Sequence, residues 1–222
     1  ELWAEVEVNG EYDAGVDTQV RREGTGPEDA LSPLVWRSLA FTAGDGSQVL
    51  TVPDDRRFDA SRVGLDSDWT VETWFLLGND ADDTGSLVKR YRRGDEAAAF
   101  DLGIEDGRPY VRTTGVDGVE YKVVARQGLP VTEDSGWVHL AATWQTLSHS
   151  LTLYIDGVLA GSLPVRADDI VAGSGSFWTT ELMGARNGEY LVGNLDDVRI
   201  WTNTLSGRSG YRSQYQVRAF MS

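Results

Sequence analysis

Large apolar residues alternate with polar or small residues along most of the chain, which is the period of two that a half-buried β-strand requires. In the segment 70–77, Val71, Phe75 and Leu77 fall on one face of the predicted strand and Glu72 falls on the other. The same alternation begins the chain at 1–12. It predicts further strands within 38–52, on either side of a break at 43–46, and at 87–91, 98–104, 109–114, 119–125, 137–144, 151–155, 158–163, 177–184 and 194–201.

Asp-Gly dipeptides separate several of these segments. They occur at Asp106-Gly107, Asp117-Gly118 and Asp156-Gly157, and Asp-Gly is among the strongest signals for a two-residue hairpin. No segment carries a convincing helical stripe, since the nearest one, 206–220, is interrupted by two glycines. About a dozen short strands with turns at regular spacing predict an all-β fold, an antiparallel two-sheet β-sandwich of the jelly-roll type.

The length of the chain favours one domain. Its 222 residues, 41% of them apolar, are enough for a single two-layer core. We therefore predict a single domain over 1–222, in which 1–35 and 207–222 are flanking strands or linkers. The polar segment 13–33 fits either a long surface loop or a linker.

The net charge limits the partners that the chain can bind, and the absence of cysteine limits its chemistry. The net charge of −15 repels phosphate backbones and anionic lipid, which disfavours nucleic acid and membrane surfaces as partners. No apolar run approaches the roughly 18 residues that a membrane-spanning helix needs, so we expect no membrane insertion. Cysteine is absent, which excludes disulfides and thiol chemistry. The chain begins at Glu1, and we expect it to be part of a larger polypeptide.

Four segments carry motifs in a characteristic order. They are WTVETWF at 69–75, GWVHLAATW at 136–144, LTLYIDGV at 151–158 and GNLDDVRIW at 193–201. Together they resemble the laminin-G-like, concanavalin-A-like jelly-roll family, whose usual motifs are W-H-x-A, L-Y-x-D-G and G-x-x-D-[DE]-V-R-I-[WY]. The resemblance covers roughly residues 36–206 and implies the same two-sheet sandwich.

The resemblance also implies a class of function. Most domains of this kind are recognition modules, so it implies a non-catalytic extracellular module, secreted or on a cell surface, with carbohydrate as the leading ligand. The alternative is a protein–protein adhesion, receptor-binding or structural domain of a larger surface or secreted assembly. A third reading is the accessory domain of an enzyme. An aromatic and polar groove favours a sugar, whereas an exposed apolar patch at the rim favours a protein.

Calcium is the cofactor that the resemblance implies, held near the closing strand by oxygen ligands. The implied carboxylate ligands are Asp45 and either Asp196 or Asp197, because alternation sends the side chains of the last two to opposite faces. The alternative is that Asp197 pairs with Arg199 or caps a turn, and that the acidic residues serve solubility. One departure from the family is Thr42, where the family often has an aspartate.

A carbohydrate site needs aromatic faces and polar donors. The candidate ligand-binding residues are Tyr91, Arg112, Trp178, Arg186 and Tyr190. The arginines suit a sialic or uronic carboxylate, which their planar fork can bind in a bidentate manner. Tyr110 and Tyr121 are further aromatic candidates, and Arg90 and Arg92 are further donors. The alternative for any aromatic residue is a core position, which the resemblance assigns to Trp69, Trp74, Trp137, Trp144 and Trp201.

Enzymatic function is disfavoured. Jelly-roll glycosidases carry acidic residues that alternate along one strand, so that two carboxyl groups face one cleft. Here Glu72 stands alone in its strand, and the chain has only two histidines, His139 and His149. No nucleophile elbow, phosphate-binding loop or metal-spaced histidine pair occurs. We therefore predict that the protein is not an enzyme.

Overall fold

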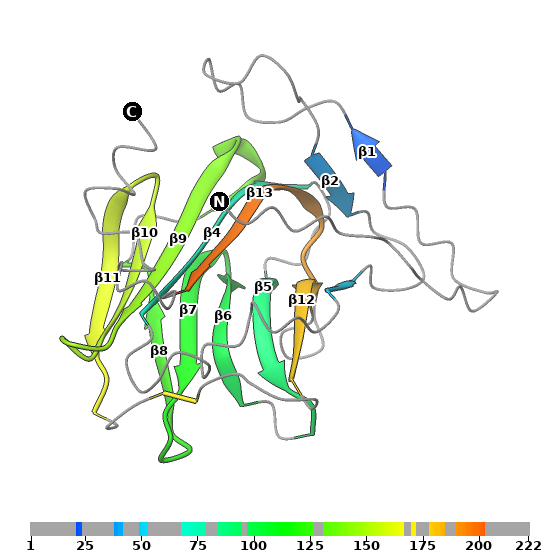
Figure 1. Ribbon diagram of the computed structural model, residues 1–222. Coiled ribbons are helices and arrows are strands. Elements are labelled where there is room, and N and C mark those ends of the chain that lie inside the picture. Colours follow the sequence, from blue (N-terminus) through cyan, green and yellow to red (C-terminus); the bar gives the residue numbers. More distant parts are fainter. Residues whose placement is uncertain are drawn as a thin grey trace.

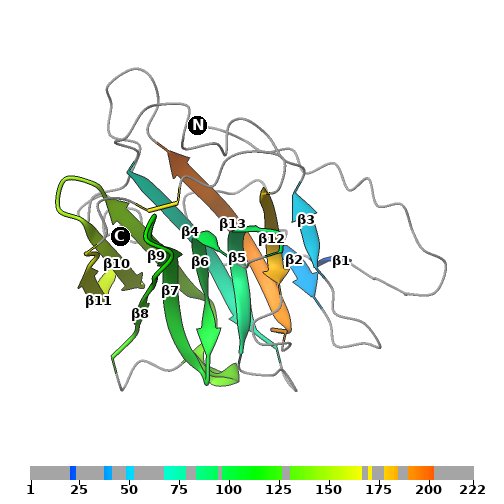
Figure 2. The same ribbon diagram turned by 90° about the horizontal axis from the view of Figure 1, so that it is seen from below.

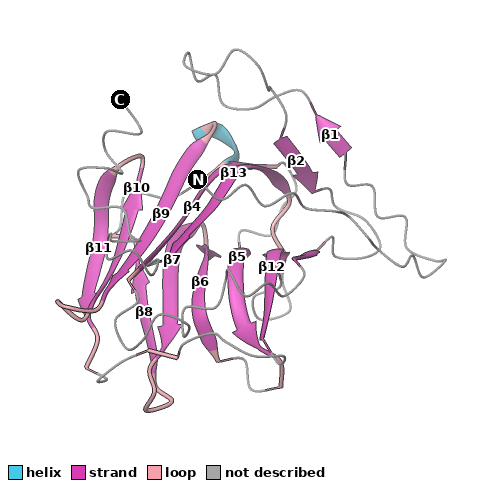
Figure 3. Ribbon diagram, viewed as in Figure 1, coloured by secondary structure: helices cyan, strands magenta, loops and turns pink. Residues whose placement is uncertain are grey.

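The strands of the chain form two antiparallel sheets (Figures 1 and 3). The computed structural model describes residues 21–23, 38–41, 49–52, 68–78, 84–94, 97–126, 131–166, 170–171, 178–184 and 190–202. The strands are β1 (Arg21–Glu23), β2 (Ser38–Phe41), β3 (Leu50–Val52), β4 (Trp69–Leu77), β5 (Gly85–Arg92), β6 (Ala98–Glu105), β7 (Arg108–Thr114), β8 (Glu120–Val124), β9 (Val138–Gln145), β10 (Ser150–Ile155), β11 (Val158–Pro164), β12 (Trp178–Gly184) and β13 (Gly193–Thr202).

The two sheets stack as a sandwich. One has seven strands in the order β1-β2-β13-β4-β9-β10-β11, and the other has six in the order β3-β12-β5-β6-β7-β8. Figure 2 shows the six strands of the second sheet side by side. The predicted fold class, an all-β antiparallel two-sheet sandwich, is therefore confirmed. The segment 38–52, predicted to hold strands on either side of a break, places β2 in one sheet and β3 in the other.

The described residues contain little helix, and the segment 206–220 lies outside them. The helical element within the described ranges is a single 3₁₀ turn, η3 (Glu133–Ser135), which precedes β9. No helix of those ranges is long and apolar enough to span a lipid bilayer. The alternating segment at 1–12 lies outside the described residues.

Two of the three predicted Asp-Gly hairpins have the expected turn. Asp106 and Gly107 have φ values of 51° and 69°, and Asp156 and Gly157 have 47° and 70°. Positive φ at both central residues defines the type I′ turn, whose twist matches that of the flanking strands. The third dipeptide differs, because the connection between β7 and β8 is five residues long and, of its Asp-Gly pair, only Gly118 has a positive φ.

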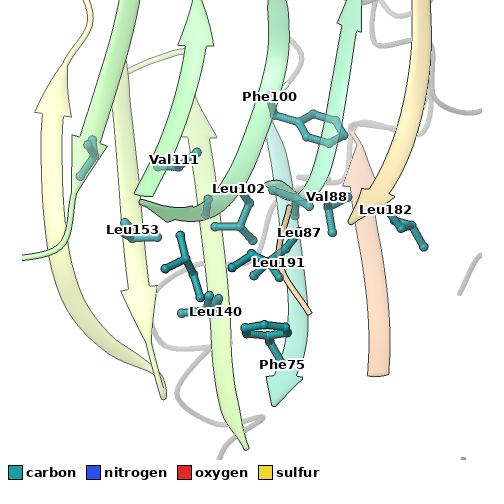
Figure 4. Close-up of a cluster of buried hydrophobic side chains, with 14 of the residues drawn as sticks. Phe75, Leu87, Val88, Phe100, Leu102, Val111, Leu140, Leu153, Leu182 and Leu191 are labelled. Carbon is teal, nitrogen blue, oxygen red and sulfur yellow. The ribbon is translucent and has the colours of Figure 1, made fainter. Parts of the chain in front are cut away.

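The core lies between the sheets (Figure 4). Phe75, Leu140 and Leu153 come from the seven-stranded sheet, and Leu102 and Val111 come from the six-stranded sheet. All five side chains are fully buried. Each occupies the inward position of its strand, so the period of two in the sequence determines the core directly.

The prediction that five tryptophans occupy core positions is confirmed in part. Trp69 and Trp144 are buried in the core, whereas Trp74 and Trp137 are only partly buried. Trp74 lies on the outer face of β4, where its ring stacks 5.2 Å from that of His139. The reason is alternation, since Trp74 shares the strand face of Glu72. The side chain of Trp201 lies outside the described residues.

Candidate functional site

A row of charged side chains crosses the outer face of the six-stranded sheet. Cross-strand pairing aligns Glu181 with Lys89, Lys89 with Asp101, Asp101 with Arg112, and Arg112 with Lys122. Their neighbours along β5, β6 and β7 include core residues, so alternation turns the row away from the other sheet. Cross-strand neighbours of opposite charge stabilise a sheet. The row joins five of the six strands.

Arg112 is the centre of this row. Its Nε lies 2.6 Å from Oδ2 of Asp101, which is fully buried, and its Nη1 lies 2.8 Å from Oε2 of Glu120. Burial alone would lower the pKa of Arg112, but the charges and hydrogen bonds of the two carboxylates outweigh it and raise that pKa. The predicted sugar donor Arg112 is thus engaged by two carboxylates of its own chain.

Tyr110 extends the same network. Its hydroxyl donates to Oδ1 of Asp101 at 3.0 Å and lies 3.2 Å from Oγ of Ser86. The tyrosine is fully buried, and its ring lies over Gly103. A Cβ at Gly103 would collide with the backbone carbonyl oxygen of Gly85 and would approach the Tyr110 hydroxyl oxygen to 2.8 Å, so this position requires glycine. The structure therefore places Tyr110 in the sheet's internal network.

The other acidic side chains of this outer face are paired too. Glu181 lies 3.2 Å from the Lys89 ammonium, and Glu105 contacts Lys122. With Asp101 and Glu120, these are the acidic residues on the described strands of the face. The arrangement is an ion-pair network, unlike the two facing carboxyl groups, one of them protonated, that glycoside hydrolysis uses.

One end of the sandwich gathers exposed turns. At this end, the bottom of Figure 1, β5 and β7 end and β6, β8 and β12 begin. We call it the lower rim and define it by the turn at Arg93 and Gly94, the hairpin tip at 115–119 and the turn at 146–149. The Trp69 ring at the start of β4 lies 5.5 Å from that of Phe100 near the start of β6, so both sheets reach this end.

Two predicted aromatic residues lie on neighbouring strands at this rim. Trp178 at the start of β12 pairs with Arg92, and the next residue, Thr179, pairs with Tyr91. The Arg92 guanidinium carbon lies 6.0 Å from the centre of the Trp178 ring, and Arg93 Nη2 lies 3.4 Å from Thr179 Oγ1. Arg92 and Arg93 are exposed. We call Tyr91, Arg92, Arg93 and Trp178 the arginine corner.

Several contacts hold the arginine corner in place. The Tyr91 hydroxyl donates to Glu181 Oε1 at 2.8 Å, and the Lys89 ammonium lies 4.2 Å from the centre of the Tyr91 ring. Trp178 is mostly buried, and the backbone N–H of Arg92 donates to the carbonyl of Ala97. The corner therefore presents its arginines from a rigid sheet end.

The remaining predicted ligand residues do not join this corner. Tyr190 is half-buried and lies at the opposite end of β5, because a Cβ on Gly85 would come within 3.3 Å of its carbonyl carbon. Arg112 sits mid-sheet, two strands from β5. Arg186 lies outside the described residues. From the predicted set, Tyr91 and Trp178 lie on neighbouring strands at this end, with their side chains on opposite faces of the sheet, because Tyr91 pairs with Thr179 and Trp178 pairs with Arg92.

The predicted calcium ligands are only partly described. Asp196 Oδ1 accepts the backbone N–H of Asp197 at 2.8 Å, and Asp197 Oδ2 accepts a hydrogen bond from Arg199 at 2.8 Å, the pairing considered as the alternative. Asp197 has a φ of 53° at a register shift between β13 and β4, so the alternation assumed from sequence breaks there. Asp45 lies outside the described residues.

Metal ligands do not cluster in the described part of the chain. No group of three acidic, histidine or cysteine side chains lies close enough there to hold an ion. Burial raises the pKa of Asp196, the hydrogen bond from the Asp197 backbone opposes this rise, and the charge of Asp197 adds to it. The calcium site stays a prediction that rests on the resemblance.

Sequence reasoning missed two features. Arg93 was not proposed as a donor, although consecutive arginines at the end of a predicted strand signal a charged sheet end. The pair formed by Glu72 and His139 was also missed. The two side chains lie 3.5 Å apart and are both buried on the outer face of the seven-stranded sheet. The sequence shows that each residue lies on the polar side of its predicted strand. It does not show the strand register, which makes Glu72 and His139 diagonal neighbours.

Comparison with known proteins places this fold in a family. The model for the concanavalin A-like lectin/glucanases superfamily matches residues 44–209, most of the chain. The chain belongs to this superfamily. The predicted resemblance to laminin-G-like, concanavalin-A-like domains is thus confirmed. None of the curated proteins matches the concanavalin A-like chain in sequence.

Solved structures share the superfamily fold at low identity. The CBM40 module of the Ruminococcus gnavus IT-sialidase, bound to α2,3-sialyllactose, is 14% identical with a TM-score of 0.56, and the match covers 83% of this chain and 93% of that one. The binding domain of Paraclostridial mosquitocidal protein 1 is 15% identical with a TM-score of 0.59, covering 83% of this chain and 43% of that one. This concanavalin A-like chain therefore spans less than half the length of the toxin domain. A pentraxin of Limulus polyphemus is 14% identical with a TM-score of 0.50, over 71% and 72% of the two chains.

Proposed function

We propose that this concanavalin A-like domain is a non-catalytic carbohydrate-recognition module whose arginine corner binds a carboxylated sugar. The observation that carries the proposal is the placement of two exposed, consecutive arginines at one sheet end, with Arg92 against the Trp178 ring and Arg93 beside Thr179. A guanidinium binds a carboxylate through two parallel hydrogen bonds, and aromatic side chains supply apolar area beside it. The two exposed guanidinium groups meet the first requirement, whereas Trp178 is 8% exposed and packs in the core.

The arginine side chains of the corner already have contacts that position them, which supports the proposed carboxylate binding. Arg92 lies over the Trp178 ring and Arg93 lies near Thr179. Side chains that are already placed lose less conformational entropy when they bind. The corner also stands on paired strands, and sites built on strands are more precise than sites on loops.

The charge of the chain limits the kind of anion. Its net charge is −15, so a long polyanion is repelled by most of the surface. A small glycan with one carboxylate can contact the arginines while its uncharged hydroxyls face the remaining surface. The proposal therefore favours a carboxylated glycan over a nucleic acid.

The paired carboxylates support a binding role over a catalytic one. Asp101, Glu105, Glu120 and Glu181 each contact a cationic side chain. The sialyllactose named for the Ruminococcus module is a glycan of the proposed class. The same proposal includes two further properties that the family resemblance implies. The module is extracellular, and it binds a calcium ion.

The test is a panel of immobilised glycans in which each carboxylated sugar is matched by its neutral, reduced counterpart. The panel is run with calcium and again with chelator. The wild type is compared with an Arg92→Ala/Arg93→Ala double variant and with Arg126→Ala. Arg126 is the matched control, because it is exposed but follows β8 at the opposite end.

We expect the wild type and Arg126→Ala to bind carboxylated members selectively. Hydrogen bonds to charged groups contribute about 1.5–3 kcal/mol each, so the double variant should lose at least about tenfold in affinity. Equal binding of the neutral counterparts, or an equal loss in Arg126→Ala, would contradict the assignment.

A further inference from the structure

The tip of the β7–β8 hairpin exposes two aliphatic side chains. Val116 is 61% exposed and Val119 is 50% exposed. Single exposed apolar residues are common on protein surfaces, so exposure by itself assigns no role. What distinguishes this pair is its rigidity and its position beside the arginine corner.

The hairpin tip is held by its own hydrogen bonds. Gly115 N–H donates to the Val119 carbonyl and Gly118 N–H donates to the Gly115 carbonyl, both at 2.9 Å. The Asp117 carboxylate accepts from the Val119 N–H and from the Tyr121 hydroxyl, each at 3.0 Å. Ordering of the tip therefore needs no ligand.

A second segment braces the hairpin from outside. Gly115 forms an antiparallel bridge with Ile170, and the Val171 N–H donates to the Thr114 carbonyl at 2.9 Å. Residues 170–171 thus pair with the end of β7 and the first residue of the hairpin tip. The two valines stand on a fixed base, which lowers the entropy cost of any contact they make.

The hairpin tip and the arginine corner are joined through β6. Ala98 N–H donates to Thr114 Oγ1 at 2.9 Å, and Thr113 Oγ1 donates to the Ala99 carbonyl at 2.8 Å. Because β6 alone separates β5 from β7, the strands that carry the two features run about 10 Å apart, twice the usual strand spacing. This separation is within the span of a small oligosaccharide.

We propose that Val116 and Val119 are specificity-determining residues that bury the methyl group of an N-acylated sugar while the arginine corner holds the carboxylate of the same glycan. This inference rests on the proposed function. Aliphatic side chains offer no hydrogen bond, so they select the apolar part of a ligand, and on a polar sugar the acyl methyl is such a part. The corner supplies the charge complementarity that fixes the glycan beside them.

The test uses matched ligands and matched variants. The ligands are a sialyl oligosaccharide with an N-acetyl group and its counterpart in which a hydroxyl replaces the acetamido group. The variant is Val116→Thr/Val119→Thr, which exchanges methyl for hydroxyl at nearly constant volume. Val158→Thr is the control, because Val158 is 58% exposed but begins β11 at the opposite end of the sandwich. Affinities are measured by titration calorimetry, and folding is checked by thermal unfolding.

We expect the wild type and Val158→Thr to prefer the N-acetylated ligand by about fourfold, the effect of burying one methyl group. The double threonine variant should lose this preference and keep its affinity for the hydroxyl counterpart. Equal weakening of both ligands, or an unchanged preference, would overturn the inference and leave the arginine assignment standing. If the wild type binds neither ligand, the proposed function fails and this inference fails with it.

Discussion

Removal of the Asp101 charge should destabilise the domain more than any surface substitution. Asp101 is fully buried, and its partner Arg112 is 7% exposed. In Asp101→Asn the guanidinium keeps only Glu120 as a charged partner in this network, and the side chain of Glu120 is 43% exposed. The Tyr110 hydroxyl, which donates to Asp101 at 3.0 Å, also loses its charged acceptor.

The size of the effect follows from burial. Breaking a buried ion pair costs about 3–5 kcal/mol, and the remaining contact with Glu120 places Asp101→Asn near about 3 kcal/mol. For a chain of this length each kcal/mol shifts the unfolding midpoint by about 2–4 °C, so we expect a fall of about 6–12 °C. Thermal unfolding followed by circular dichroism at pH 7 measures it.

Glu120→Gln is the matched control, because it removes the other carboxylate from the same guanidinium. An exposed ion pair contributes about 0–1 kcal/mol, so its midpoint should fall by less than about 4 °C. The double variant Asp101→Leu/Arg112→Met should be more stable than Asp101→Asn, since apolar replacement of a buried pair is often neutral. Equal shifts for Asp101→Asn and Glu120→Gln would refute the argument from burial.

Three further substitutions test other parts of the fold. In chelator at pH 7, Asp196→Asn should raise the unfolding midpoint, because burial raises the pKa of Asp196 in the folded state and the charged form is therefore destabilising there. The gain should vanish below the ordinary carboxyl pKa of about 3.9, and a pH-independent gain would count against it. Glu72→Gln should lower the free energy of unfolding, measured by urea titration, by about 2 kcal/mol, because it weakens a buried contact with His139, and an unchanged free energy of unfolding would contradict this. Gly103→Ala should cost about 1–3 kcal/mol, because its Cβ would collide with the backbone carbonyl oxygen of Gly85 and would approach the Tyr110 hydroxyl to 2.8 Å. Wild-type stability in this variant would contradict this, because relief of the collision requires the backbone of β5 or β6 to move.

The sequence predicts the strands better than the site. Alternation identifies inward residues such as Phe75 and Leu140, and Asp156-Gly157 identifies a type I′ turn, because both signals are local. The register that aligns Asp101 with Arg112 is not local, since it depends on which strands become neighbours. An outward charge in the segment 98–104 was visible, but its burial was not.

The candidate site shows the same limit. Tyr91 and Trp178 were both named from sequence, yet they are far apart in the chain and reach the same end of the sheet only through the pairing of β5 with β12, where their side chains face opposite sides. Trp74 was assigned to the core from the resemblance, whereas strand alternation correctly places it on the outer face. At Asp197 the alternation itself fails, because a positive φ and a register shift interrupt β13.

The most direct test of a carboxylate-binding corner is the affinity of one carboxylated glycan and of its reduced alcohol, measured by titration calorimetry on wild type and on Arg93→Ala. The account predicts that reduction weakens wild-type binding at least about tenfold, since a charged hydrogen-bonded contact is lost. Arg93→Ala should bind the carboxylated form more weakly and discriminate much less between the two. Equal affinity of the wild type for the acid and the alcohol would contradict the assignment of the arginine corner.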